Sequence, residues 1–421
     1  MGNSLKEKLL NLDKENLCNY ITELEEKLSL AKKCLPYVQK ATISSDERKK
    51  FLADVPLSKL IKIAPQEALD NSYNDKRKKL GRHQKNTGVY LWKNGYDPKS
   101  LLGVGANGVV WNCGGKAVKV TCNIRLGPFN IVNAIKDEIH DVNTLQTIIS
   151  NKREYEKIDK ETKQKKEKPI DAKKYLAISK NINNATQDNK KHIFESELAQ
   201  GDLSSQAADI RNKKNIDTII RIGKEVLKAL KVIHDAGYSH NDVKPDNLLL
   251  ITRNISQAKK AIKENEAKEK EAKEENEAKE KEEAKEAVKL ADFGAMTKFD
   301  NTHKIFVNLK FSPPDWYKTT PEAVKKRDVY ALGAVLMFLL IGDKNKSIGK
   351  KLAKELWSKG EEHIYNKYNL GGKYCNGKNS DKNKEKVMNL LITIRYMVAD
   401  SYKQRLTVDE ALQRMLKINE N

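Results

Sequence analysis

A helix–loop–strand succession in residues 216–251 constrains the fold of this chain more than any other part of the sequence. Apolar residues recur at three- and four-residue steps along Ile216–Ala236, which predicts an amphipathic helix, and Gly237 stands where such a helix commonly ends. A polar loop, His240–Asn247, follows at once, and the apolar run Leu248–Ile251 after it has the length of a strand. A helix and a strand are therefore expected at the two ends of one short polar loop.

The loop itself carries residues that suit phosphoryl transfer. Asp242 is followed by Lys244 and then by Asn247. A carboxylate can accept the proton of an attacking hydroxyl, an ammonium can neutralise charge on a moving phosphate, and an amide oxygen can hold Mg²⁺. As a single octapeptide the loop is only moderately specific, so its interpretation depends on the rest of the chain.

Composition bounds the class of protein. The chain has 421 residues, of which 38% are hydrophobic and 33% charged. This length allows a core of roughly 270 residues with extensions. The composition is polar for one compact globule, so we expect part of the chain to be solvated helix or loop. No run of about 18 apolar residues occurs, and no membrane-spanning helix is expected.

The cysteines and the first residues indicate a compartment. The start of the chain lacks an apolar signal core, and no two of the five cysteines form a Cys-x-x-Cys pair. We therefore expect reduced thiols and an intracellular, cytoplasmic protein. Two alternatives stay open: the host cytosol, if the protein is a secreted effector, and the nucleus, if the basic run 75–82 is an import signal. A linker is the favoured interpretation of that run.

The net charge of +22 admits binding to nucleic acid or to an anionic membrane. The lysines are spread along the whole chain, however, and aromatic residues make up only 6%. A lysine-rich solvated surface is therefore favoured over either of these partners.

Two segments differ in character from the rest. Leucines recur at helical spacing in the first part of residues 1–87, which predicts a helical N-terminal extension that packs on the remainder or on a protein partner. Residues 258–287 repeat Glu, Lys and Ala with an 11-residue period and many Glu-to-Lys pairs four apart. A solvated helix or a disordered tether is expected for this low-complexity insert, residues 258–287, and a coiled coil is the alternative.

Short runs predict the other elements. We expect β-like runs at 89–92, 175–178 and 192–194, a strand–glycine loop–strand unit over 101–111, and strands at 116–120 and 288–290. Helices are expected near 131–150, over the apolar run 330–341, and through most of the remainder to about residue 416.

The glycine loop follows the spacing Gly-x-Gly-x-x-Gly. Its residues are Gly103, Val104, Gly105, Ala106, Asn107 and Gly108, with Val110 beyond. Strands are expected on both sides and no helix opens at the third glycine, which favours a hairpin over phosphates rather than a dinucleotide-binding turn. Glycines let backbone amides approach anionic oxygens without a Cβ in the way. A hairpin without a ligand is the structural alternative.

The motifs together resemble the eukaryotic-type Ser/Thr protein kinases over roughly residues 95–416. In the family's order stand the glycine loop, Ala117-Val118-Lys119, the loop 240–247, Asp292-Phe293-Gly294, Ser312-Pro313-Pro314-Asp315, Asp328–Gly333 and Arg405. The resemblance implies an α+β bilobal fold with a helical extension, residues 1–87. The kinase domain would then cover residues 88–418, with a small β-rich N-lobe at about 88–198 and a mainly helical C-lobe at about 199–418.

The resemblance also implies roles. Asp242 is the catalytic base and Lys244 stabilises charge, while Asn247 and Asp292 hold Mg²⁺, with Mn²⁺ as an alternative. The glycine loop with Val110 covers ATP, and Ala117, Lys119, Glu138 and Asp202 complete its site. Asp315 pairs with Arg405, and Asp328 steadies the backbone of the catalytic loop.

Two residues depart from the family pattern. Asn241 replaces an Arg that docks a phosphate in many kinases, which predicts activity that does not depend on phosphorylation of the activation loop. Asn308 stands where a Thr is usual, and the insert 258–287 lengthens the spacing between Asn247 and Asp292.

The sequence therefore favours a Ser/Thr protein kinase that acts on ATP and protein substrates. A pseudokinase or scaffold that recruits partners through the extension is the main alternative. A small-molecule kinase and a nucleic-acid-binding protein are further ones.

Overall fold

The computed structural model describes nine segments of the chain and three isolated residues. The segments are 64–69, 86–105, 108–121, 170–181, 192–251, 286–300, 309–342, 348–375 and 380–418, with the single positions 46, 49 and 60 besides. They belong to two compact units, Met1–Leu101 and Leu102–Asn421. Several predictions lie outside the described residues: the leucine pattern, the helix near 131–150 with Glu138, nearly all of the 258–287 insert, Ala106, Asn107 and Asn308.

The first unit contains two short helices that pack against each other, α5 (Gln66–Leu69) and α6 (Thr87–Lys93). The β-like run expected at 89–92 is therefore wrong, because these residues form α6. A short apolar run that is buried on all sides has no alternation of exposed and buried positions, so periodicity cannot separate helix from strand. A turn at Asn94–Gly95 follows α6, with Gly95 at φ 90°.

A five-stranded sheet has the order β1-β2-β3-β5-β4. Its strands are β1 (Pro98–Gly105), β2 (Gly108–Cys113), β3 (Lys116–Thr121), β4 (Lys180–Asn181) and β5 (Ile193–Glu197). The pairs β2–β3, β3–β5 and β4–β5 are antiparallel. Val109, Trp111, Val118 and Val120 are buried at alternate positions, which is the period of a strand with one covered face. The predicted strands around the glycine loop are confirmed.

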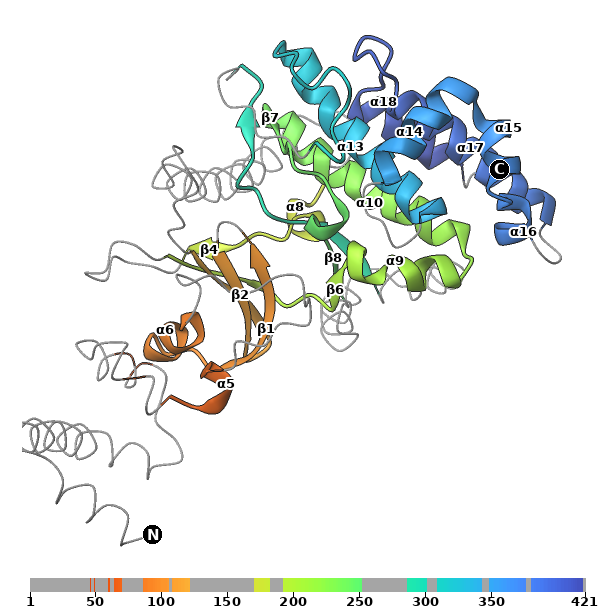
Figure 1. Ribbon diagram of the computed structural model, residues 1–421. Coiled ribbons are helices and arrows are strands. Elements are labelled where there is room, and N and C mark those ends of the chain that lie inside the picture. Colours follow the sequence, from red (N-terminus) through yellow and green to blue (C-terminus); the bar gives the residue numbers. More distant parts are fainter. Residues whose placement is uncertain are drawn as a thin grey trace, which may run out of the picture. The chain divides into compact units, whose positions relative to one another are not determined.

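The rest of the second unit is mainly helical (Figure 1). Helix α10 (Ile216–Asp235) buries its apolar face against α13 (Pro321–Ile341) and α18 (Val408–Lys417). The other helices are α8 (Ala172–Tyr175), α9 (Leu203–Asn212), α14 (Ile348–Lys359), α15 (Glu361–Lys367), α16 (Leu370–Tyr374) and α17 (Ser380–Met397). The predicted helices at 216–236 and 330–341 are confirmed, and α13 begins earlier than expected. No helix among the described residues is long and apolar enough to cross a bilayer.

Short strands flank the polar loop on both sides. β7 (Tyr238–Ser239) pairs with β10 (Thr297–Lys298), and a three-stranded sheet has the order β6 (Gly201–Asp202), β8 (Leu248–Ile251), β9 (Ala287–Leu290). The strand expected at 175–178 is wrong except at Leu176, which forms an isolated bridge with Leu290 after α8 ends. The loop is therefore held by α10 and β7 before it and by β8 after it.

Glu355 on α14 gathers three donors from α15 and the residue after it. Its carboxylate accepts hydrogen bonds from Lys367 Nζ at 2.5 Å, His363 Nε2 at 2.9 Å and Tyr368 Oη at 3.0 Å. Burial alone would raise the pKa of Glu355, but these hydrogen bonds outweigh it and lower the pKa to about 2. The ionised carboxylate therefore joins α14 to α15 over a wide pH range.

Glu355→Gln is expected to lower the free energy of unfolding by about 2 kcal/mol at neutral pH, because hydrogen bonds to a charged group are lost. The folded pKa of Glu355 lies below its unfolded value, so the stabilisation is present above about pH 4.5 and is lost as the pH falls towards about 2. Urea unfolding of both proteins between pH 7 and pH 2.5 measures this. The exposed Glu385 on α17 provides the control, Glu385→Gln, and a difference that does not shrink in acid would contradict the assignment.

Candidate active site

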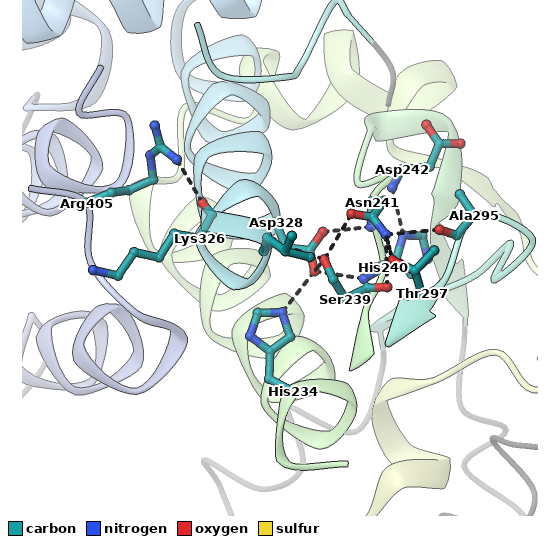
Figure 2. Close-up of polar contacts among 11 residues, drawn as sticks. His234, Ser239, His240, Asn241, Asp242, Ala295, Thr297, Lys326, Asp328 and Arg405 are labelled. Carbon is teal, nitrogen blue, oxygen red and sulfur yellow. Dashed lines mark hydrogen bonds and ion pairs between the residues drawn. The ribbon is translucent and has the colours of Figure 1, made fainter. Parts of the chain in front are cut away.

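Asp328 in α13 anchors the backbone of the polar loop. Its side chain is 1% exposed and accepts hydrogen bonds from the N–H groups of His240 and Asn241, each at 2.8 Å (Figure 2). Ser239 Oγ at 2.8 Å and His234 Nε2 at 2.9 Å also contact this carboxylate. Burial would raise the pKa of Asp328, but the hydrogen bond and charge of His234 and the donors of the loop lower it. The predicted role of Asp328 in holding the loop backbone is confirmed.

His240 links Asp242 to the residue that precedes Asp292. Its Nε2 lies 3.1 Å from the carbonyl oxygen of Ala291, which can only accept, so Nε2 carries the proton. Burial lowers the pKa of His240 and favours the neutral ring. Nδ1 is then an acceptor and receives the N–H of Asp242 at 3.3 Å. One buried imidazole thus orients the backbone at Asp242 and at Ala291, the residue before Asp292.

The side chain of Asp242 contacts the two other polar residues of the loop. Lys244 Nζ and Asn247 Nδ2 both donate to Asp242 Oδ2, the latter at 2.9 Å. Asn247 Nδ2 also donates to the Asp242 carbonyl at 2.8 Å, and a short 3-10 turn, Pro245–Asn247, sets this geometry. Among the described residues no donor contacts Asp242 Oδ1, so one carboxylate oxygen is left to accept a proton.

Lys119 and Asp292 meet although they are far apart in sequence. Lys119 Nζ, on β3, lies 3.9 Å from Asp292 Oδ1, and the two side chains are 22% and 44% exposed. Displacement of water by the surrounding protein raises the pKa of Asp292, but the charges of Lys119 and Lys244 outweigh this and lower it. The Asp292 carboxylate is therefore ionised at neutral pH, next to two ammonium groups.

Arg405 and Asp315 form the predicted ion pair. Arg405 Nη2 lies 2.9 Å from Asp315 Oδ1, and the arginine side chain is 0% exposed. The guanidinium also donates to the carbonyl oxygen of Ala399 and stacks over the ring of Tyr330. This pair ties the segment before α13 to the loop before α18.

Comparison with known proteins agrees with this arrangement. The family model of the protein kinase domain matches residues 146–416, which is more than half of the chain. The chain belongs to the protein kinase family.

Relatives of this kinase domain are distant. The calcium/calmodulin-dependent protein kinase type II alpha chain of Drosophila melanogaster is 25% identical over 196 residues, which cover 45% of this chain and 28% of that protein. Sperm motility kinases 3A and 3B of Mus musculus are each 28% identical over 122 residues, 28% of this chain and 18% of those proteins. The chain thus spans less than a third of the length of each of these relatives.

The kinase domain offers oxygen donors for a divalent cation. Among the described residues, no group of three or more His, Cys, Asp or Glu side chains is placed so that it could hold a metal ion by itself. Mg²⁺ commonly uses one or two protein oxygens and takes its other ligands from water and substrate phosphates. Asn247 directs its Nδ2 to Asp242, which leaves Oδ1 as a ligand, and Asp292 supplies an ionised carboxylate. This donor set fits Mg²⁺ and, by the same chemistry, Mn²⁺.

Parts of the glycine hairpin have a structural explanation. A Cβ on Gly108 would lie 2.5 Å from the carbonyl oxygen of Val120, so the pairing of β2 with β3 itself requires glycine there. A Cβ on Gly103 would meet only Val110 Cβ, at 3.9 Å, and no packing contact explains this glycine. The predicted nucleotide-binding roles of Gly103, Val104, Gly105 and Val110 on β1 and β2 therefore stay predictions.

The structure shows where two other predicted nucleotide-site residues, Ala117 and Asp202, lie, and their roles stay predictions. Ala117 lies on β3 opposite Ser196 of β5. Asp202 caps α9, where its Oδ1 accepts the N–H of Ser205 at 2.7 Å, so its predicted role near the ribose stays a prediction.

Sequence reasoning missed the contacts of Asn241. Its side chain bonds to Ala295 and Thr297, which follow Gly294 (Figure 2). Neither Thr297 nor Ser239 was recognised as part of the site, because each belongs to a strand of two residues that has no sequence signal of its own.

Proposed function

We propose that this protein transfers the γ-phosphoryl group of ATP to serine and threonine hydroxyls of protein substrates. The observation that carries the proposal is the cluster in the loop: the Asp242 carboxylate is contacted by Lys244 and Asn247 while its Oδ1 stays available. Lys244 supports the choice of Ser/Thr over Tyr, because the sequence resembles Ser/Thr kinases at this position, whereas the tyrosine kinases of the family usually place other residues there.

Each residue has a stated task in this proposal. Asp242 Oδ1 accepts the proton of the attacking hydroxyl, and Lys244 neutralises charge on the phosphoryl group as it moves. Lys119 holds the phosphates in line, which is chiefly a matter of positioning. Asn247 and Asp292 would hold Mg²⁺, which when bound neutralises charge on the phosphate oxygens.

The direct test is incubation of the full chain with γ-³²P-ATP, Mg²⁺ or Mn²⁺, and casein, followed by phosphoamino acid analysis of the product. Labelled phosphoserine or phosphothreonine is the expected result. Labelled phosphotyrosine alone would contradict the specificity. No transfer with either metal would contradict the enzyme and favour the scaffold that recruits partners through its extension.

We also propose that activity does not require phosphorylation of the segment between Asp292 and Ser312, since no Arg precedes Asp242. Treatment with a protein phosphatase is expected to change the initial rate by less than about twofold, because no guanidinium is present there to bind a phosphate. Mass spectrometry of the treated protein verifies that phosphate is absent. Loss of activity on treatment, with recovery in Thr302→Glu, would show the opposite.

A further inference from the structure

Asn241 has an unusual backbone conformation for a residue with a side chain. Its φ is 63° and it is 8% exposed, while its N–H donates to Asp328 Oδ1 at 2.8 Å. Asn adopts this left-handed region more readily than longer side chains do, because its short amide can bond locally. The residue type therefore suits the conformation that Asp328 imposes on the loop.

The amide of Asn241 joins the loop to the segment that follows Asp292. Nδ2 donates to Thr297 Oγ1 at 2.8 Å and to the carbonyl oxygen of Ala295 at 3.0 Å, with a longer contact of 3.3 Å to the Ser239 carbonyl. Oδ1 lies 3.2 Å from Ser239 Oγ, which is also 2.8 Å from Asp328 Oδ2. The two protons of one amide are thus used by two oxygens, those of Ala295 and Thr297, in the segment that follows Gly294.

The acceptors carry no charge. A carbonyl and a hydroxyl receive the amide protons, and Thr297 is itself 7% exposed, in register with Ser239 between β10 and β7. A buried guanidinium at this position would need an anionic partner, whereas a neutral amide is satisfied by the fold alone. The connection therefore needs no added phosphate.

We propose that Asn241, Ala295 and Thr297 form a latch in which Asn241 is a positioning residue. The latch holds the loop with Asp242 and Asn247 in register with the segment that carries Asp292. The contacts above support the latch as a feature of the fold. Its effect on catalysis rests on the proposed function.

Hydrogen–deuterium exchange of the full chain tests the latch without reference to activity. Asn241→Gly keeps the left-handed backbone and removes the amide, and Thr297→Val removes one acceptor without changing the shape. Each variant is expected to speed exchange of residues 294–300 by about tenfold or more, with α10 unchanged. The double variant should exchange no faster than Asn241→Gly alone, because the contact that Thr297→Val removes is already lost there.

Thr393→Val is the matched control, since Thr393 is also buried and its hydroxyl bonds only to Asn389 in its own helix. It should leave exchange at 294–300 as in the unmodified protein, and Thr297→Ser, which keeps the acceptor, should protect the segment. Unchanged exchange in both Asn241→Gly and Thr297→Val would overturn the latch.

Kinetics tests the positioning role. Asn241→Gly and Thr297→Val are expected to lower kcat about tenfold while the KM for ATP changes less than about threefold, because the reacting groups are misaligned after ATP has bound. Faster exchange with an unchanged kcat would overturn the positioning role. If the unmodified protein transfers no phosphate, the proposed function fails, and exchange alone still decides whether the latch exists.

Discussion

Asp242→Asn is expected to lower the rate of phosphoryl transfer by roughly 1,000-fold, the range typical of a lost general base. Asn has nearly the same shape as Asp, so its oxygen can still accept from Lys244, and the loop backbone keeps its bonds to Asp328. A neutral amide cannot take the proton of the substrate hydroxyl. The rate with saturating ATP and casein measures the effect.

The control for this change lies in the same loop. Asp246→Asn also removes one carboxylate, and its rate is expected to stay within about threefold of the unmodified protein, because no transferred proton is assigned to it. Urea unfolding should show that the Asp242 variant is folded. Equal rates for Asp242→Asn and the unmodified protein would remove Asp242 from the chemistry.

Arg405→Met is expected to lower the free energy of unfolding by about 3–5 kcal/mol, because it leaves the Asp315 carboxylate, which is only 14% exposed, without its charged partner. The change also removes the bonds to the carbonyl of Ala399 and the stacking on Tyr330, which Met cannot replace. The midpoint and slope of urea unfolding measure the loss.

Arg414→Met provides the comparison for a surface arginine. Arg414 stacks over the exposed ring of Tyr396, and its loss is expected to cost less than about 1 kcal/mol. The double variant Asp315→Ala with Arg405→Met should cost clearly less than the two single changes together, because each single change leaves one member of the ion pair without its charged partner. An equal loss in the free energy of unfolding for Arg405→Met and Arg414→Met would show that the Arg405–Asp315 pair stabilises the fold no more than a surface arginine does.

Periodicity predicted the long elements and failed on the short ones. α10 and α13 have many apolar positions with a consistent pattern, so their type follows from side chains that lie near one another in sequence. The runs at 89–92 and 175–178 are too short to show a period, and burial on every side decided their conformation. The helix at 89–92 and the bridge at Leu176 come from packing that no local pattern records.

Some features of the candidate site could likewise be predicted from the sequence, and others could not. The residue types and spacing of Asp242, Lys244 and Asn247 follow from the chain itself, and the order of the kinase motifs made the pair Asp315–Arg405 predictable over a long separation. The tautomer of His240 was not predictable, because it depends on a carbonyl, that of Ala291, which every residue possesses.

The sequence by itself determined which chemical groups stand in the catalytic loop and that the chain folds as a kinase, because these depend on residue type, spacing and motif order. Only the tertiary structure decided what Asn241 does. The sequence shows a missing arginine, whereas the fold brings the amide to Ala295 and Thr297. That contact depends on the pairing of two very short strands and on the carboxylate of Asp328 beneath the loop, which are properties of backbone geometry and packing.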